Sequence, residues 1–318
     1  MDDAGQSSIT EYVITSLALG LVLEALTPNK VSTVSYVKSI KNLNIYKFIA
    51  STFVLYNVFK LILNDASPGM RFGYWIKEGV KALINHSAIG TNTSLGYLML
   101  SIPIVYALKD YELTHGINPY NLAVRASTIL VSRASDEDAS DFYEALQLIN
   151  PSYANSYAGS VPDLRNVISR GRYRLSEVLM ESSYWDLIAY DITHNYVLTL
   201  DAHYFMLRKL TEDFDLFRAV NKTQLFILSR LVDSEVFKSG SVISALNIRA
   251  YCSIIIKLIN NYHYLEDCYQ LTGKLDAELR SRHLNTGTVA DILALATSFT
   301  LISLPGLNTS AENPLVAV

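Results

Sequence analysis

The chain has 318 residues, of which half are hydrophobic and 18% are charged, and its formal net charge at pH 7 is −4. A chain of this length can bury a large core, and the low charged fraction requires one. The negative balance provides no general attraction to nucleic acid, so we predict no nucleic-acid partner. Any anionic ligand must then be held by a local site.

Apolar residues recur at three- and four-residue spacing along most of the chain, which predicts amphipathic helices. In chain order these segments are 8–26, 45–64, 72–85, 97–108, 138–148, 175–188, 198–210, 222–232, 243–259 and 289–301. Strand-like alternation is scarce, and the sequence has no Asn-Gly or Asp-Gly hairpin turn. We therefore predict an all-α fold, a single large, multi-helical, bundle-like domain over residues 1–318.

A Tyr-, Ser-, Gly- and Asn-rich stretch at 150–162 interrupts this pattern. It is typical of a loop, and it could divide two helical lobes. We favour one domain, because the apolar content is spread evenly and no charged or low-complexity linker intervenes.

Two apolar runs, 94–108 and 292–307, raise the question of membrane spans. Both are shorter than the roughly 20 residues that a span needs, and each contains a proline. Two lysines interrupt the longer stretch 45–63. We interpret all three as core helices and predict no membrane partner. The acidic, polar first residues do not resemble a secretory signal, so we expect a cytoplasmic protein.

A polar loop bounded by Gly90 and Gly96 precedes the apolar run 97–108. A loop of this kind that opens a helix presents free backbone N–H groups, and together with the helix dipole they favour phosphate. Asn92 and Thr93 add side-chain donors and oxygen ligands that suit Mg²⁺. The alternative interpretation is an ordinary helix N-cap with glycine turns.

A second loop of the same character, 285–288, has the sequence Asn-Thr-Gly-Thr and opens another apolar helix. Asp291 would lie in the first turn of that helix, where a carboxylate either complements the dipole or ligates a cation. Further upstream, Asp186 stands in an apolar frame and is predicted to point inward, where it needs a partner or a proton. An arginine cluster between the loops suits either an oxyanion or a solvated turn: Arg165, Arg170, Arg172 and Arg174.

Three segments resemble, in order, the motifs of one family. The segment GTNTSLGYLMLSIP at 90–103 resembles GxNTNxG…LLxxP, and residues 175–189 resemble LLEVM…RDLIA. The segment LDAELRSRHLNTGTVAD at 275–291 resembles LDxxLRxRGxNPGTTAD and is the most specific of the three. On these motifs the chain resembles the triphosphoribosyl-dephospho-CoA synthase family, in particular its archaeal-like branch, from about Leu17 to Leu304.

The resemblance implies an all-helical transferase that moves the triphosphoribosyl group of ATP onto dephospho-CoA, or a related acceptor, with release of adenine. ATP and dephospho-CoA would be its partners, and Mg²⁺ would accompany ATP. It makes Glu24, Asp186 and Asp291 the candidate catalytic carboxylates, and Glu24, Asn92 and Asp291 the candidate metal ligands. The candidate nucleotide-binding residues are Gly90, Thr91, Asn92, Thr93, Gly96, Asn285, Gly287, Thr288 and Lys30.

The chain departs from the family in its N-terminal motif. Where the family has an acidic residue followed by KPGNV, this sequence has Glu24 and then Thr-Pro-Asn-Lys-Val at 27–31. Thr27 replaces a lysine that would face polyphosphate, and Asn29 replaces a glycine that would permit close backbone approach. Lys30 could restore the charge from a displaced position. The alternative hypothesis is a catalytically degenerate homologue that binds a nucleotide or acts as an interaction protein.

Overall fold

A computed structural model describes residues 3–109, 111, 117–150, 173–239, 242–262 and 265–304. These residues form helices and no strand, with one isolated β-bridge between Ile40 and Leu43. The helices are α1 (Asp3–Leu26), α2 (Ile45–Asn64), α3 (Phe72–Asn85), α4 (Leu95–Lys109), α5 (Pro119–Arg133), α6 (Asp136–Ile149), α7 (Leu175–Ser182), α8 (Leu187–Thr193), α9 (Val197–Asp213), α10 (Leu216–Arg230), α11 (Ser234–Lys238), α12 (Val242–Tyr262), α13 (Leu265–Ser281) and α14 (Gly287–Ser303). The predicted all-α fold is confirmed.

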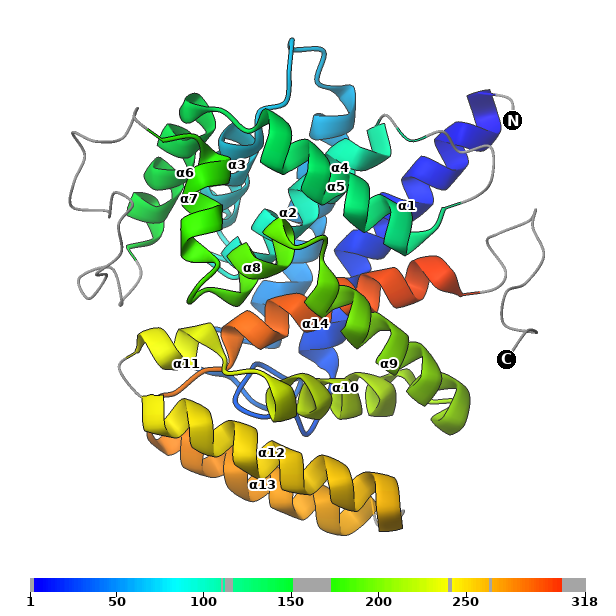
Figure 1. Cartoon of the computed structure of the whole chain (residues 1–318), viewed down its shortest axis with the longest axis vertical. Coiled ribbons are helices and arrows are strands. Elements are labelled where there is room, and N and C mark those ends of the chain that lie inside the picture. Colours follow the sequence, from blue (N-terminus) through cyan, green and yellow to red (C-terminus); the bar gives the residue numbers. More distant parts are fainter. Residues whose placement is uncertain are drawn as a thin grey trace.

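Helices α4 and α14 form the centre of the molecule (Figure 1). In α4 every residue from Tyr97 to Leu108 is buried, and α14 is buried along almost its whole length. A helix that is apolar on all sides must be enclosed by other elements. Helix α14 packs on α1, α9, α4 and α10, and α4 also packs on α5 and α3. The two short apolar runs are therefore core helices, as predicted.

The other helices surround this centre in pairs. Helices α3 and α6 pack together, as do α9 and α10, and α12 packs on both α10 and α13. Figure 1 shows α12 and α13 as a pair at the bottom of the view, with α4 and α5 near the top and α14 between the two groups. The first residues of α4 and α14 thus lie in the interior, where they can form the wall of a site.

The sequence missed some boundaries. The predicted segments do not include α5, α11 and α13. The segment 175–188 is two helices, because the chain turns at 183–186 and a new helix, α8, begins at Leu187. Helix α5 has a low hydrophobic content, but Pro119 in its first turn and Asn118 as its N-cap were available signals. Of the proposed lobe boundary at 150–162, all but Asn150 lies outside the described residues.

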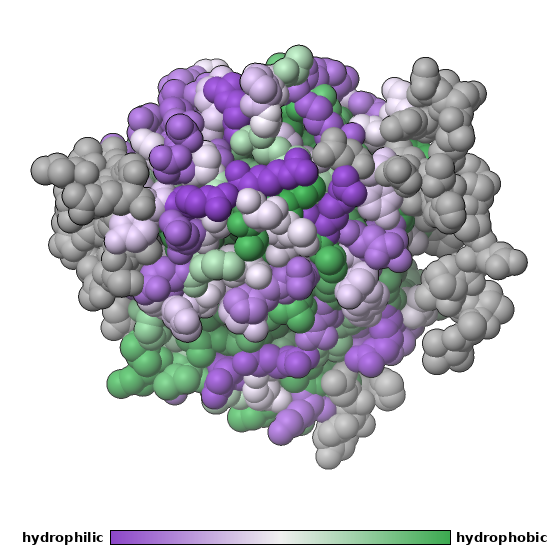
Figure 2. Space-filling model, turned by 45° about the horizontal axis from the view of Figure 1, so that its top comes forward, coloured by the Kyte–Doolittle hydropathy of each residue, from purple (hydrophilic) through white to green (hydrophobic). Residues whose placement is uncertain are grey.

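Three helices are long and apolar enough to cross a membrane by length and composition: Ser7–Leu26, Ile45–Asn64 and Val242–Ile259. Of these, only the second was weighed as a span from the sequence, where its two lysines spoke against it; the first and third are additional candidates by length and composition. In the folded chain 56%, 33% and 39% of these windows are buried. Figure 2 shows apolar side chains gathered at the lower left of one face and polar ones over much of the rest.

Candidate active site

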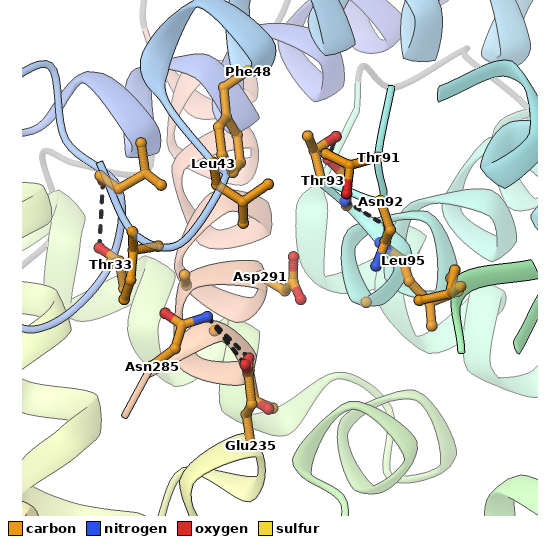
Figure 3. A pocket seen from close by; sticks show the side chains of 18 of the residues that line it. Thr33, Leu43, Phe48, Thr91, Asn92, Thr93, Leu95, Glu235, Asn285 and Asp291 are labelled. Atoms are coloured by element: carbon orange, nitrogen blue, oxygen red, sulfur yellow. Dashed lines mark hydrogen bonds between the residues drawn. The ribbon is translucent and has the colours of Figure 1, made fainter. Parts of the chain in front are cut away.

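A cavity of about 470 Å³ lies where the first residues of α4 and α14 meet. Its wall is completed by the end of α1, the segment 33–43, the start of α8 and helix α11. Figure 3 shows Asp291 between the residues that precede α4 on one side and Asn285 with Glu235 on the other. The polar residues of the wall are Glu24, Thr33, Lys41, Asn42, Thr91, Asn92, Thr93, Ser94, Asp186, Glu235, Lys238, Asn285, Thr288 and Asp291.

The α4 start, residues 90–96, is built largely from its own side chains. Gly90 has a φ of +62°, the left-handed region that glycine adopts without strain. The Oδ1 atom of Asn92 accepts hydrogen bonds from the backbone N–H of Ser94 at 3.1 Å and of Leu95 at 3.0 Å. Thr93 is fixed from the side by the hydroxyl of Ser51 on α2, at 2.7 Å. Asn92 therefore caps α4, the alternative interpretation of the sequence pattern, and its amide nitrogen remains to serve the cavity.

Gly96 has a different role from Gly90. A Cβ atom at Gly96 would stand 2.2 Å from Oδ2 of Asp291, a distance that no real side chain tolerates. The glycine is needed because the Asp291 carboxyl lies against the first turn of α4, where the backbone N–H of Tyr97 points toward it. The prediction that Asp291 lies in the first turn of α14 is wrong, because Asp291 lies one turn further along. It therefore faces the start of α4 rather than that of its own helix.

The α14 start, residues 285–291, is held by groups from α11 and the residue before it. Oδ2 of Asp233 accepts the backbone N–H of Val289 at 2.8 Å, and its Oδ1 accepts two N–H groups of α11. A Cβ atom at Gly287 would stand 2.1 Å from Oε2 of Glu235. The amide of Asn285 donates to both carboxyl oxygens of Glu235, at 3.2 and 3.1 Å. A glycine again allows a carboxylate to approach a helix start.

Asp233, Glu235 and Lys238 were not singled out from the sequence. They stand on and beside the short helix α11, which carries too few residues for a periodic pattern. One signal was present, because Asp233 followed by Ser-Glu is typical of a helix N-cap. Nothing in the local sequence indicates that the same carboxylate also caps α14, 56 residues later in the chain.

Glu24 and Lys30 form a buried ion pair behind the cavity wall. Glu24 lines the cavity, whereas Lys30 does not, so the predicted direct contact of Lys30 with a nucleotide is not supported by its position. Lys30 does not reach the cavity because its ammonium group points into the protein and pairs with the Glu24 carboxylate. Thr27 is fully buried, and its hydroxyl donates to the carbonyl of Leu23 at 2.8 Å. Asn29 has a left-handed backbone conformation, with φ +58°, which asparagine tolerates better than most residues.

Buried polar side chains from α10 and α13 hold the segment 27–39 in place. Gln224 forms two hydrogen bonds to the backbone of Val31, at 2.7 and 3.1 Å. Asp276 accepts the N–H of Ser32 at 2.8 Å and is itself bonded by Arg280 at 2.7 Å. Asp276 and Arg280 belong to the first half of the C-terminal motif, and Asp291 is its last residue. Here they position the N-terminal segment and do not line the cavity.

Asp186 lies at the edge of the cavity and is occupied by structural contacts. It is the N-cap of α8, with Oδ1 accepting the N–H of Ile188 at 2.8 Å and of Ala189 at 3.1 Å, while Oδ2 pairs with Lys238. Burial acts to raise the pKa of Asp186, but Lys238 and the two N–H groups outweigh it and lower the pKa overall. A carboxylate with a lowered pKa is a weak base, so this geometry does not favour the predicted catalytic role.

Asp291 and Glu235 in the wall, and Asp233 next to it, have raised pKa values. Burial raises the pKa of Asp291 well above its usual range, and the nearby charges of Glu235, Glu24 and Asp233 add to this effect. Burial also raises the pKa of Glu235, with Asn285, Lys41 and Lys238 opposing it. Burial and the charge of Glu235 raise the pKa of Asp233 to about 7. Carboxyl groups that hold protons near neutral pH are suited to proton transfer.

The residues of the wall do not form a resident metal site. Among the described residues, no group of three or more His, Cys, Asp or Glu could hold a metal ion. Of the predicted ligand set, Glu24 is paired with Lys30, and Oδ1 of Asn92 accepts two backbone N–H groups. The third, Asp291, faces the backbone N–H of Tyr97. Mg²⁺ keeps several waters and is usually bound through one or two carboxylates together with substrate phosphates.

The structure brings most of the predicted site residues together. Every one of them except Lys30 lines the same cavity, although they come from four separate parts of the chain. Three arginines of the cluster lie outside the described residues. Arg174 is described and donates to the backbone carbonyls of Ala134 and Ser132, both at 2.9 Å, so it serves the end of α5.

The chain matches the ATP:dephospho-CoA triphosphoribosyl transferase family over residues 10–309. A crystal structure from Archaeoglobus fulgidus, assigned as a triphosphoribosyl-dephospho-CoA synthase, superposes with a TM-score of 0.59 and 18% sequence identity. The likeness covers 80% of this chain and 97% of the archaeal chain and concerns the fold. A comparison with curated proteins gave no match. Since the family match spans nearly the whole sequence, the chain belongs to the ATP:dephospho-CoA triphosphoribosyl transferases.

Proposed function

We propose that the cavity between the α4 and α14 starts is where this transferase moves the triphosphoribosyl group of ATP onto dephospho-CoA. The observation that carries the proposal is the position of Asp291. Its carboxyl group lies against Gly96 at the first turn of α4, in the wall of the cavity, with a pKa raised far above its usual range. The neighbouring Glu235 is a second carboxyl group with a raised pKa in the same wall.

The reaction breaks the bond between C1′ of the ATP ribose and the adenine nitrogen, and forms a bond from C1′ to an acceptor hydroxyl. Substitution at an anomeric carbon passes through an oxocarbenium-like state, as in glycoside hydrolysis. Adenine must gain a proton as it leaves, and the acceptor hydroxyl must lose one. Two carboxyl groups whose environments differ can divide these tasks.

We assign the acid to Asp291 and the base to Glu235. Burial and three surrounding carboxyl groups disfavour the charged form of Asp291 and raise its pKa, so Asp291 is suited to donate a proton to the departing adenine. Glu235 feels the same burial, but Asn285, Lys41 and Lys238 stabilise its ionised form, so it can accept the hydroxyl proton. This division replaces Asp186 and Glu24, which are committed to structural pairs.

The triphosphate does not react, but the protein groups that bind it position the ribose for the reaction. Lys41 and Lys238 are the cationic side chains of the cavity wall, and the amide nitrogen of Asn92 and the hydroxyl of Thr91 add neutral polar contacts. We propose that these groups hold the triphosphate and that Mg²⁺ is bound mainly by the nucleotide. When bound, the metal would neutralise phosphate charge; every proton transfer above is assigned to the chain's own residues.

The test is adenine release from purified protein incubated with ATP, Mg²⁺ and dephospho-CoA, followed by chromatography. We expect adenine to accumulate in proportion to the modified acceptor, and only when both substrates are present. Adenine release without an acceptor would indicate hydrolysis and contradict the transfer. Thermal stabilisation by ATP without any adenine release would indicate a nucleotide-binding protein that does not turn over. No stabilisation by either substrate would refute the assignment of this cavity.

A further inference from the structure

The Glu24–Lys30 pair is the most deeply buried ion pair of the described chain. The side chains are 4% and 0% exposed, respectively. Glu24 forms part of the cavity wall, while Lys30 approaches it from the protein side. Burial lowers the pKa of Lys30 and raises that of Glu24, and each partner opposes the shift of the other. Whichever group holds the proton, the pair has no net charge, so Glu24 adds no net negative charge to the cavity.

The other carboxyl groups near the cavity are committed in a similar way. Asp186 is bonded to Lys238, and both oxygens of Asp233 cap helix starts. Both oxygens of Glu235 accept the amide of Asn285. Of the four carboxyl groups in the cavity wall, Glu24 and Asp186 are thus paired with lysines, Glu235 is held by Asn285, and Asp291 faces the backbone N–H of Tyr97. Two of the four charges are neutralised within the fold, so this donor set fits a resident Mg²⁺ poorly.

Lys30 occupies a position where the motif that this segment resembles has an asparagine. An uncharged side chain there would leave Glu24 as a buried carboxylate without a counter-charge, which is costly unless a cation or a proton arrives. A divalent cation in the cavity could then use Glu24 and Asp291 together. Lys30 supplies the counter-charge to Glu24 from the protein itself, so no cation is required beside Glu24.

We propose that Lys30 takes the place of a resident divalent cation beside Glu24, so that the free protein binds no metal in the cavity and Mg²⁺ enters only on the nucleotide triphosphate. The second part rests on the proposed function, because it requires ATP to bind here. The first part does not, since it concerns the protein without substrates.

The experiment is a titration with Mn²⁺, which prefers the same oxygen ligands as Mg²⁺ and whose free concentration is read from its electron paramagnetic resonance signal. It is made at pH 8 without nucleotide on the wild type, Lys30→Asn and the double variant Lys30→Asn/Glu24→Gln. The matched control is Lys222→Asn, which breaks another partly buried pair, with Asp213, away from the cavity.

We expect no Mn²⁺ site in the wild type or in Lys222→Asn. Lys30→Asn should bind one Mn²⁺ per chain at least tenfold more tightly than the wild type, and the double variant should lose it. A stoichiometric Mn²⁺ site in the wild type would overturn the proposal, as would Lys30→Asn binding no better because Glu24 takes up a proton instead. If Lys30→Asn does not fold, the wild-type titration still decides the first part.

A second titration, with ATP present, separates the two proposals. The wild type should then bind Mn²⁺ together with ATP in a one-to-one ratio. Binding of Mn²⁺ that requires ATP, without adenine release, would keep the metal proposal and refute the transfer. If the wild type binds Mn²⁺ before ATP is added and also releases adenine, the transfer is supported and the metal proposal is refuted.

Discussion

Helices α4 and α14 begin beside each other at one cavity, and each start places a glycine against a carboxyl group. At α4 the pair is Gly96 with Asp291, and at α14 it is Gly287 with Glu235. The two starts differ in how they are capped. Asn92 caps α4 from two and three residues upstream. Helix α14 receives its cap from Asp233, because the hydroxyl of its own N-cap residue, Thr286, donates to the carbonyl of Val31 and does not cap the helix.

One helix start is therefore stabilised by residues near it in sequence, and the other by a residue far from it in sequence. The α4 start is stabilised mainly by its own sequence, so a change there should have a contained effect. The α14 start depends on Asp233 and α11, and that dependence brings Glu235 to the cavity. The glycines, which look like phosphate-binding loops in sequence, act at both starts by making room for a carboxyl group.

The largest expected effect concerns the carboxyl group at the α4 start. Asp291→Asn keeps the size and polarity of the protonated acid but cannot donate a proton to adenine. We expect adenine release to fall by about 10²- to 10⁴-fold, the usual contribution of a general acid. The melting temperature should fall little, because the amide keeps the size of the acid and carries none of the charge that burial and the nearby carboxyl groups disfavour. Asp201→Asn, which alters an exposed pair with Arg230, is the control, and equal rates in both variants would refute the acid role.

The cap of α14 should make stability depend on pH. The folded pKa of Asp233 is about 7, above the unfolded value near 3.9. Its contribution to the free energy of unfolding is therefore fully present below pH 4 and is lost as pH rises toward 7, by about 1.4 kcal/mol per pH unit for one proton. Denaturant unfolding of the wild type and Asp233→Asn at pH 4 to 8 measures this. The difference between the two should change across that window, and a constant difference would contradict the raised pKa.

The glycines test the shared feature of the two starts. Gly96→Ala should destabilise the fold by about 1–3 kcal/mol, the usual cost of overpacking, because Asp291 has a short side chain that cannot easily move. Gly287→Ala should cost less, since the atom it meets is the end of the longer Glu235 side chain. Gly273→Ala in α13 meets nothing within 4 Å and should stabilise the fold by about 0.5–1 kcal/mol. Equal effects at Gly96 and Gly273 in chemical unfolding would show that the close approach to Asp291 is absent.

The sequence could predict the helical class and most of the cavity wall, because both depend on local patterns. Apolar periodicity located the long helices, and the two polar loops before apolar runs indicated where two helices begin inside the molecule. Glu24 was found through a family motif and Asp186 through its apolar frame, but the structural roles of both were missed. Each is neutralised by a lysine, and only one of these lysines, Lys30, lies near its partner in sequence.

The rest depends on contacts between distant segments. Glu235 was missed because α11 is a single short turn without periodicity, and because its partner Asn285 lies 50 residues away. The Asn29 substitution looked like the loss of a glycine, but asparagine tolerates the same left-handed conformation, so the turn is kept. The helix break at 183–186 was missed because Asp186, which seemed to be an inward-pointing acid, is the N-cap of the next helix.

The smallest effect separates the two functions of Asn92 at the α4 start. Asn92→Ala removes both the cap and the amide that faces the cavity, so it should lower stability by about 1 kcal/mol and weaken ATP binding. Asn92→Asp keeps an oxygen acceptor for the N–H groups of Ser94 and Leu95, so its stability should match the wild type. Its added negative charge should nonetheless weaken ATP binding at least as much as alanine does. Thermal unfolding and ATP titration of both variants decide this. If Asn92→Asp binds ATP like the wild type, Asn92 is a cap alone and the triphosphate lies on the α14 side of the cavity.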